Sequence, residues 1–511
     1  MPWQRLTTPV LALVPNDKNG VNSSQGHKGA AELIRRALSC IGALFVAWLA
    51  LYLLDIGCVF HLMTGIPCPG CGMTRAWLAA LRLDFAAAFA SMMEEDAPVL
   101  VGCDPRTSSE MLRCAVISSL AGCGCRVVDG GILTAGMMHF LVPRFGFGGG
   151  MLITGGHQAA GWNALIPLAA DGSYFDGLRQ RELFDLYHGR RFRAAAASGV
   201  HPFEPLGPEM LETYWNYLAE TLDISAIAAA EFRVVGDFCN GSGAAHARTF
   251  AERLGLDLVS VNDVPSGVLP RDPEPRPRSE SPIRSIIAPL GAAAGLVFNS
   301  DMSRMGVVSD TGEPLSEELT FPLLLDYVLE RFPAGSRVVT NICSSRTIDD
   351  VVSRHGDVLE KGKVGQANVI DMMRSTGAVA AGEGSGSVTI HGMNGFDGFL
   401  MAGLLLEAIA RRRIPLSSQV AALPRYEMVK QTIPCDSPHA YLLLRRLRDE
   451  FDDEAEVNDC DGLRFDWPDG FLSLRLSSTE GSLRLISEAR SRETAQERAW
   501  RARLLWERLS S

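Results

Sequence analysis

The stretch FRVVGDFCNGSGAAHARTFAERLGLDLVSVN, residues 232–262, places a Val-rich strand, a glycine-rich turn, an amphipathic helix and a second strand in succession. Short strands that alternate with helices of about ten or more residues are typical of βαβ units in mixed sheets. The same order opens PVLVGCDPRTSSEMLRCAVISSLAGCGCRVVDGG, residues 98–131, and SRVVTNICSSRTIDDVVSRHG, residues 336–356. Three such openings predict three α/β domains of like architecture.

Two other stretches depart from this pattern. SGVLPRDPEPRPRSESP, residues 266–282, is too rich in proline and charge for a core element, and we interpret it as a surface loop of the second domain. After LPRYEMVKQTIPCDSP, residues 423–438, the chain combines a charged helix, strands, the turn RLSSTEGSLRL and a final Arg/Glu-rich helix. We therefore predict a smaller α+β domain at the C-terminal end.

The composition is that of a globular protein, with 511 residues, 47% hydrophobic and 21% charged. This length suffices for three to five domains that each bury a core. The net charge of -11 argues against a nucleic-acid partner, because a broad binding surface for phosphates needs clustered Lys and Arg. Most of the 12 cysteines lie in apolar runs, which we interpret as reduced core thiols of a cytosolic domain.

One segment near the N-terminus is typical of a membrane protein. Residues 41–60, IGALFVAWLALYLLDIGCVF, are apolar except for Asp55 and have about the length that a bilayer requires. Arg35 and Arg36 precede the segment and favour a cytoplasmic N-terminus. The alternative is a buried helix of a soluble domain. A single span would place the following domains outside, whereas a helical hairpin would keep them inside; we expect a cytoplasmic domain with membrane attachment through residues 41–60.

A cysteine-rich turn follows this segment. Four soft ligands would suit a tetrahedral zinc site, but a lone C-x-x-C favours free thiols in a turn. These residues are Cys58, His61, Cys68 and Cys71. The stretch TGIPCPGCGMTRAWLAALRLDFAAAF resembles a small family of bacterial membrane proteins of unknown function, over roughly residues 30–92. An Ala-rich helix over residues 74–93 would follow.

Eight motifs extend over the rest of the chain in a fixed order: VGCDPRTSS, TGGHQAAGWN, GDFCNGSGA, DPEPRPRSE, VFNSDMSRMGVVSDTGE, KVGQANV, GEGSG and RLSSTEGSLRLISEA. In order and spacing they resemble the α-D-phosphohexomutases, which include phosphoglucomutase, phosphomannomutase and phosphoglucosamine mutase. The resemblance implies three mixed α/β domains and a fourth domain around a shared cleft. It also implies phosphate transfer between the 1- and 6-positions of a hexose through a phosphoserine, with Mg²⁺. The implied divisions are an N-terminal region at 1–94, a first domain at 95–197 that lacks the family's N-terminal segment, and further domains at 198–312, 313–428 and 429–511.

The resemblance implies that the phosphate-carrying serine falls at Gly156, in TGGHQA, residues 154–159. Glycine has no oxygen nucleophile, so covalent phosphoryl catalysis is not expected there. We interpret the hydroxyl of Thr154 as loop-stabilising, and His157 as a hydrogen-bonded loop residue. The family's lysine that assists proton transfer falls at Ile166.

The metal loop departs from the family in the same way. The D-G-D-x-D-R pattern is NSDMSR here, so that Asp301 is kept while Asn299 and Ser303 replace carboxylates. Mg²⁺ depends on carboxylate charge, and we therefore expect weak or lost metal binding. Arg304 remains, and its planar guanidinium suits a phosphate group.

The residues implied in substrate recognition persist. Glu383 and Ser385 lie in GEGSG, a turn whose glycines would allow close approach to a sugar, and the family reads the 3- and 4-hydroxyls there. Lys363 matches a family lysine near the cleft. The turn after residue 474 matches the family's distal phosphate site, with a guanidinium and hydroxyls that suit an anion. Its residues are Arg475, Ser477, Ser478 and Thr479.

Three hypotheses follow for function. The first is a family member that binds a hexose phosphate without mutase turnover, because the losses affect chemistry and spare recognition. The second is an active mutase with rearranged catalytic groups. The third is a fused or decayed gene product, which the abrupt junction near residue 93 would explain.

Overall fold

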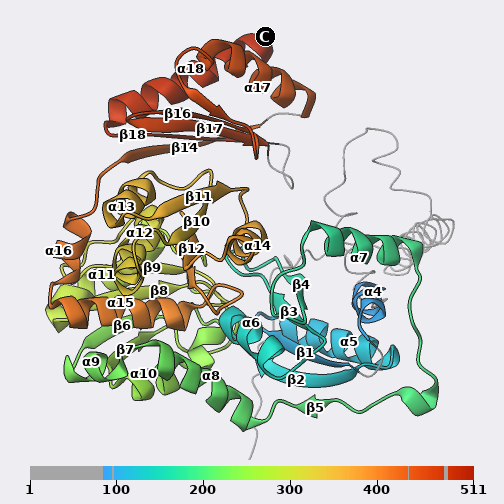
Figure 1. The fold of residues 1–511 in the computed structure, drawn as a ribbon. Helices are drawn as coiled ribbons and strands as arrows, with labels where there is room; N and C mark the ends of the chain where they lie inside the picture. Colours follow the sequence, from blue (N-terminus) through green and yellow to red (C-terminus); the bar gives the residue numbers. More distant parts are fainter. Residues whose placement is uncertain (1–83, 95–96, 435–436, 477–481, 511) are drawn as a thin grey trace, which may run out of the picture. The chain divides into compact units, whose positions relative to one another are not determined.

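The computed structural model describes residues 84–94, 97–434, 437–476 and 482–510, all within one compact unit, Ala79–Ser511. Four β-sheets organise this part of the chain (Figure 1). The first three sheets mix parallel and antiparallel strand pairs, whereas the pairs of the fourth are antiparallel. The predicted mixed-sheet α/β fold class is confirmed for these residues.

The first sheet has the strand order β4-β3-β1-β2-β5. Its strands are β1 (Pro98–Cys103), β2 (Arg126–Ile132), β3 (Gly149–Thr154), β4 (Ala164–Ala169) and β5 (Glu204–Pro205). Its helices are α4 (Asp84–Met92), α5 (Ser109–Gly122), α6 (Ala135–Arg144) and α7 (Gly177–Gly189). Thr134 caps α6 by accepting the Met137 N–H, and Asp176 caps α7, so both helices begin where a polar side chain satisfies free backbone amides.

The second sheet has the order β7-β6-β8-β9, and the third has the order β11-β10-β12-β13. The second consists of β6 (Arg233–Asp237), β7 (Asp257–Val261), β8 (Ala294–Phe298) and β9 (Met305–Val308), with α8 (Pro208–Thr221), α9 (Ile224–Ala229), α10 (Ala247–Leu254) and α11 (Pro277–Leu290). The third consists of β10 (Arg337–Asn341), β11 (Val358–Gly362), β12 (Ala380–Glu383) and β13 (Ser387–Ile390), with α12 (Glu317–Val328), α13 (Thr347–His355), α14 (Gln366–Thr376), α15 (Gly398–Arg412) and α16 (Leu416–Ala421).

These three sheets repeat one topology. In each, the first strand pairs in parallel with the second and third, and the third pairs in antiparallel with the strand that follows it. The loops after β3, β8 and β12 therefore occupy corresponding positions in the three sheets. These loops are residues 155–163, 299–304 and 384–386.

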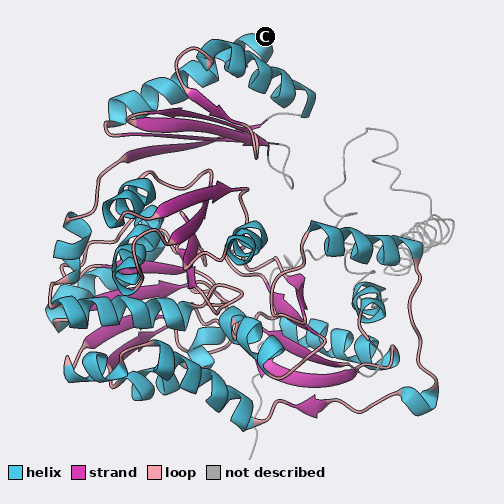
Figure 2. Ribbon diagram, in the orientation of Figure 1, coloured by secondary structure: helices cyan, strands magenta, loops and turns pink. Residues whose placement is uncertain are grey.

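The fourth sheet has the order β14-β18-β17-β16-β15. Its strands are β14 (Glu427–Pro434), β15 (Glu456–Asn458), β16 (Leu463–Trp467), β17 (Gly470–Leu476) and β18 (Ser482–Ala489). The helices α17 (Ser437–Phe451) and α18 (Arg492–Ser510) lie over one face of this sheet (Figure 2). This region has the α+β character that the sequence predicts.

Helix α4 belongs to the core of the first sheet. Its Phe89 is fully buried and packs against Phe175 with ring centroids 5.8 Å apart. A Cβ at Gly149 of β3 would lie 3.0 Å from the Phe89 ring. The part of the Ala-rich 74–93 segment that the structure describes is thus covered by protein, although the sequence groups it with the N-terminal region.

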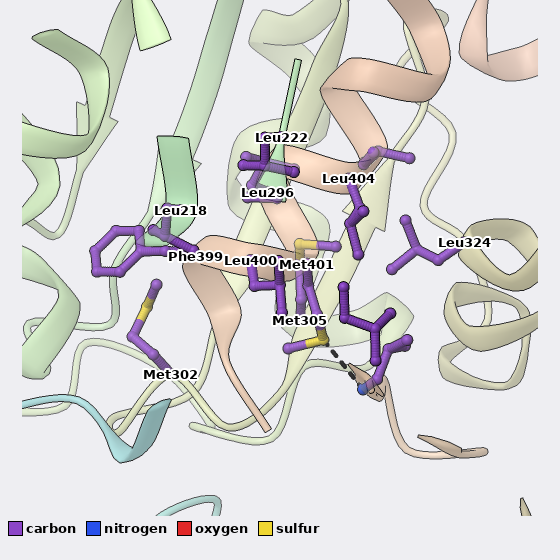
Figure 3. Close-up of a cluster of buried hydrophobic side chains, with 14 of the residues drawn as sticks. Leu218, Leu222, Leu296, Met302, Met305, Leu324, Phe399, Leu400, Met401 and Leu404 are labelled. Atoms are coloured by element: carbon purple, nitrogen blue, oxygen red, sulfur yellow. Dashed lines mark hydrogen bonds between the residues drawn. The ribbon is translucent and has the colours of Figure 1, made fainter. Parts of the chain in front are cut away.

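A second core joins the elements around the 299–304 loop (Figure 3). Met302 is fully buried there, packed beside α15, although its backbone has φ +63°. This left-handed conformation is unfavourable for a bulky residue, and burial of the side chain offsets its cost. The loop is therefore anchored at its middle residue.

None of the helices in the described residues is long and apolar enough to cross a membrane. Residues 41–60 and the group Cys58, His61, Cys68 and Cys71 lie outside the described residues. Of the seven cysteines that the structure describes, Cys103, Cys123, Cys125 and Cys239 are buried, and all seven are free thiols.

Candidate functional site

The loops after β3, β8 and β12 contain most of the residues that the sequence singles out. In the first loop, the Thr154 side chain is buried and its hydroxyl lies 2.8 Å from Asp104 Oδ2 and 3.1 Å from Asp301 Oδ2. The Gly156 N–H donates to the same hydroxyl at 2.8 Å. A hydroxyl enclosed by two carboxylates and an amide fits the predicted loop-stabilising role and is out of reach of a bulky phosphosugar.

Gly156 faces the second loop directly. A Cβ built at this position would lie 3.2 Å from Asp301 Oδ2, and the backbone has φ +54°. Loops 155–163 and 299–304 therefore meet at Gly156 and Asp301. A serine at position 156 would have to adopt a left-handed conformation, which costs about 1 kcal/mol for a residue with a side chain.

His157 and Arg304 lie close enough to interact electrostatically. Burial, together with the Arg304 guanidinium, lowers the pKa of His157 to about 4, so its imidazole is neutral at pH 7. Arg304 donates from Nη1 to Glu274 Oε1 at 2.9 Å, and its Nε is buried without a hydrogen-bond partner among the described residues. Arg304 thus retains one unsatisfied donor.

Glu274 comes from the proline-rich stretch 266–282, which was expected to be a surface loop. Residues 277–290 of the chain instead form α11, and Arg271, 7% exposed, makes a buried ion pair with Asp237 at 2.9 Å. The surface-loop prediction is therefore wrong for residues 277–282, which are helical, and for Arg271, whose charge is neutralised by a buried carboxylate that the sequence alone does not reveal.

The residues of the 299–304 loop do not fit Mg²⁺. Asp301 Oδ1 accepts three hydrogen bonds, from Asn299 Nδ2 at 2.8 Å, Ser303 Oγ at 2.7 Å and Ser303 N–H at 3.1 Å. Asn299 Oδ1 accepts the Arg304 N–H at 3.0 Å, so the amide group of Asn299 has its NH₂ facing the carboxylate. Mg²⁺ needs oxygen ligands at about 2.0–2.1 Å, and here donors occupy the one carboxylate of the loop.

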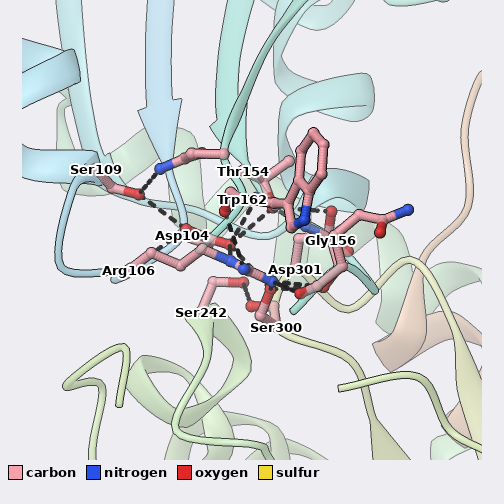
Figure 4. A network of polar contacts seen from close by, with 12 residues as sticks. Asp104, Arg106, Ser109, Thr154, Gly156, Trp162, Ser242, Ser300 and Asp301 are labelled. Carbon is pink, nitrogen blue, oxygen red and sulfur yellow. Dashed lines mark hydrogen bonds and ion pairs between the residues drawn. The ribbon is translucent and has the colours of Figure 1, made fainter. Parts of the chain in front are cut away.

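A polar network built around Arg106 joins the first two loops (Figure 4). Arg106 is 3% exposed and pairs with Asp104, 3.1 Å away. Its guanidinium also donates to Ser300 Oγ at 3.2 Å. Further N–H groups donate to the backbone carbonyls of Gly156, Gln158, Ala159 and Trp162. The Arg106 side chain therefore binds four carbonyls of the loop after β3.

The third loop contacts the second. Gly386 O accepts the Met305 N–H at 2.8 Å, and Ser387 Oγ donates to Ser303 O at 3.1 Å. Glu383 is buried and accepts from Asn341 Nδ2 at 2.9 Å and from the Gly365 N–H at 3.0 Å.

The glycines of this turn are needed for packing within the protein. A Cβ at Gly384 would lie 1.8 Å from Glu318 Oε2, and one at Gly386 would lie 2.4 Å from Met305 O. Packing alone therefore requires these glycines, and close approach of a ligand to the turn stays a prediction. Ser385 Oγ is buried without a hydrogen-bond partner in the described part of the chain.

Arg475 connects to Glu383 through a short series of contacts that passes next to Lys363 in the chain. Gly365, which bonds to Glu383, follows Val364, whose N–H donates to Asp461 Oδ2 at 3.0 Å. Arg475 Nη1 lies 3.8 Å from that carboxylate. Lys363 is exposed beside this contact. The other predicted residues of the phosphate turn, Ser477, Ser478 and Thr479, lie outside the described residues.

The chain matches two models of the same group of enzymes. Residues 212–312 match phosphoglucomutase/phosphomannomutase, alpha/beta/alpha domain II, and residues 317–426 match domain III. In these two domains the chain is similar to the α-D-phosphohexomutases. Residues 58–93 match a protein family of unknown function, DUF2752, in line with the resemblance of the N-terminal region.

Individual phosphohexomutases are similar over most of this chain. A probable phosphoglucosamine mutase and a phosphoglucomutase/phosphomannomutase of Thermococcus kodakarensis are each 28% identical to it, over 403 and 401 residues. These matches cover 78% of the chain and 88% and 87% of the two relatives. The crystal structure of a phosphoglucomutase/phosphomannomutase family protein from Burkholderia thailandensis superposes with a TM-score of 0.72 at 25% identity, covering 84% of this chain and 94% of that one.

Two features of this site do not follow from the sequence. The motif VGCDPRTSS contains Arg106, yet its role requires the loop after β3 to fold back onto it. Ser300 adds a contact between sheets, since its hydroxyl lies 2.9 Å from Asp104 Oδ2 and 2.8 Å from Gly156 O. In the sequence, the indication of this role is that Ser300 lies in the loop that corresponds to the family's metal loop.

Proposed function

We propose that the chain binds a hexose phosphate and does not interconvert the 1- and 6-phosphates. The observation that carries this proposal is a pair of unsatisfied donors, Arg304 Nε and Ser385 Oγ, both buried and both at positions implied in ligand binding. Buried donors without partners are costly, and a ligand with phosphate and hydroxyl oxygens would satisfy them.

Turnover requires groups that the candidate site lacks. Position 156 has no nucleophile, and the hydroxyls beside it, those of Thr154 and Ser300, are buried and hydrogen-bonded. With a pKa of about 4, His157 is neutral at pH 7 and does not serve as a general acid, and position 166 offers no proton donor. Without a phosphate-carrying residue, the chain has no group to which a phosphoryl group can be covalently attached between its release from one sugar hydroxyl and its transfer to the other.

Recognition would come from the third and fourth sheets. Glu383 would accept from two vicinal sugar hydroxyls, Ser385 would donate to the ring substituents, and Arg475 with Ser477, Ser478 and Thr479 would bind the distal phosphate. Lys363 would add a positive charge beside Arg475. Membrane attachment through residues 41–60 stays a prediction from the sequence.

Calorimetric titration of the full chain with glucose 1-phosphate, mannose 1-phosphate and glucosamine 6-phosphate tests the proposal. We expect at least one of them to bind, and Arg475→Ala to weaken the binding at least tenfold. The matched control is Arg248→Ala, since Arg248 is 92% exposed on α10 and pairs only with Glu252 among the described residues. Equal weakening by both variants, or no binding of any sugar phosphate, would contradict the proposal and favour a decayed gene product.

A further inference from the structure

The 299–304 loop is bound to the first sheet by direct hydrogen bonds. Ser300 Oγ lies 2.9 Å from Asp104 Oδ2 and accepts from Arg106 Nη2 at 3.2 Å. Thr154 Oγ1 lies 3.1 Å from Asp301 Oδ2. These contacts join strands of two different sheets at buried atoms, so the two loops are held together by the side chains of the chain itself.

Three residues of the loop depart from the family pattern together, and all three act as donors. Asn299 and Ser303 donate to Asp301, and Ser300 lies within donating distance of Asp104. Three buried carboxylates in this space would repel one another and would need a cation. One carboxylate that accepts bonds from an amide, a hydroxyl and a backbone N–H needs none.

The arginines near the loop are also paired with carboxylates of the protein, so that their charges need no metal site as a counterpart. Arg106 neutralises Asp104, and Glu274 neutralises part of the Arg304 guanidinium. Arg304 Nε is buried beside the loop and has no hydrogen-bond partner among the described residues. A ligand hydroxyl at this place would therefore meet a guanidinium N–H. The single phosphate of the ligand, bound by the Arg475 guanidinium as proposed above, needs no metal either.

We propose that Asn299, Ser300 and Ser303 assemble the site in the absence of a divalent cation, so that a phosphate monoester binds with equal affinity in EDTA and in Mg²⁺. The claim that the loops assemble without a divalent cation, which is the part concerning the loops, depends only on the hydrogen bonds given above. The part concerning the phosphate monoester rests on the proposed function, and two separate measurements distinguish them.

The first measurement is hydrogen exchange of the full chain, in EDTA and in excess Mg²⁺. The reporters are the amides of Gly156, which donates to Thr154 Oγ1, and of Ser303, which donates to Asp301 Oδ1. We expect protection of both amides to be the same in the two buffers. Loss of protection in EDTA that Mg²⁺ restores would overturn the proposal.

A double variant makes the contrast sharper. Asn299→Asp with Ser303→Asp replaces both donors with carboxylates around Asp301, and we expect exchange at Gly156 and Ser303 to rise at least tenfold in EDTA and to fall again in Mg²⁺. Ser118→Asp with Asn216→Asp is the matched control, since both residues are exposed on helices. If the Asn299/Ser303 variant exchanges as slowly in EDTA as the control, the hydrogen bonds do not assemble the loop and the proposal falls.

The second measurement is titration of the unaltered full chain with glucose 1-phosphate, mannose 1-phosphate and glucosamine 6-phosphate in the same two buffers. We expect dissociation constants that agree within about twofold. Binding that Mg²⁺ strengthens more than tenfold would overturn this inference and leave the proposed function intact. Absence of binding in both buffers would overturn the proposed function and the equal-affinity part, while the exchange result would still decide the part concerning the loops.

Discussion

Replacing Arg106 with methionine should release the loop after β3. The Arg106 side chain is 2% exposed and its Nε lies 3.1 Å from the Asp104 carboxylate, which is fully buried. Its other N–H groups bind four carbonyls of residues 156–162 and the Ser300 hydroxyl. Methionine keeps much of the apolar volume and removes all of these bonds.

The size of the effect follows mainly from the ion pair. Breaking a buried pair by removing one member costs about 3–5 kcal/mol, because the remaining charge is left unpaired. Gln158 and Ala159 are exposed, so their carbonyls would turn to water and contribute little more. A cost of about 4 kcal/mol corresponds to roughly a thousandfold change in the equilibrium between held and released loop, at about 1.4 kcal/mol for each factor of ten.

Hydrogen exchange of the loop amides measures this equilibrium. The amides of Gly156, Gln158 and Trp162 donate within the loop and should be protected in the unaltered chain. In Arg106→Met we expect their protection to fall at least a hundredfold, or to that of an unstructured peptide. Arg248→Met, which removes an exposed ion pair, should leave them unchanged. A change of less than tenfold in Arg106→Met would refute the reasoning.

Three further predictions concern the core, the pH and the missing nucleophile. Phe89→Ala should destabilise the first sheet by about 3–5 kcal/mol, seen as a lower melting temperature in calorimetry, whereas Phe184→Ala, at a half-exposed position of α7, should have little effect. Burial raises the pKa of Asp397 to about 6, above the value of about 3.9 in an unfolded chain, so this carboxyl makes the free energy of unfolding fall as the pH rises from about 4 to 6. Asp397→Asn should therefore remove that fall, and an unchanged pH profile would contradict the assignment. Gly156→Ser should destabilise the loop by about 1 kcal/mol, since φ is +54°, and should not restore turnover in a phosphate-release or isomerisation assay.

The order of strands and helices was predictable because each element has a local cause. The Val-rich segments at 98–103, 233–237 and 337–341 are short, buried strands, and each is followed by a polar turn and a helix, as the alternation predicts. That the loops after β3, β8 and β12 hold corresponding positions follows from the shared topology of the three sheets.

The contacts between distant segments were not predictable in this way. The family pattern makes Asn299 a lost ligand, whereas in the structure its amide donates to Asp301. The sequence suggests a ligand as the reason for the glycines of the 384–386 turn, and only the structure reveals that Gly384 and Gly386 also make room for Glu318 and Met305. Both outcomes depend on which side chains the fold brings together, and a pattern of residue types along the chain does not contain that information.

The role of α4 was also beyond the sequence. The alanines and Phe89 of this helix are compatible with packing against lipid or against protein, since both environments are apolar. Packing against Phe175 and Gly149 decides for protein in the residues described. A chain that starts at residue 95 would lose this helix, so functional experiments need the full chain.

Phosphorus NMR of the full chain with glucose 1-phosphate, mannose 1-phosphate and glucosamine 6-phosphate tests the central claim most directly, because one spectrum reports both binding and conversion. We predict broadening or a shift of the resonance of at least one sugar phosphate, with no resonance of the isomeric phosphate after prolonged incubation, in EDTA and in Mg²⁺ alike. Appearance of the isomeric phosphate with the unaltered chain would contradict the claim, and so would spectra unaffected by the protein for all three sugars.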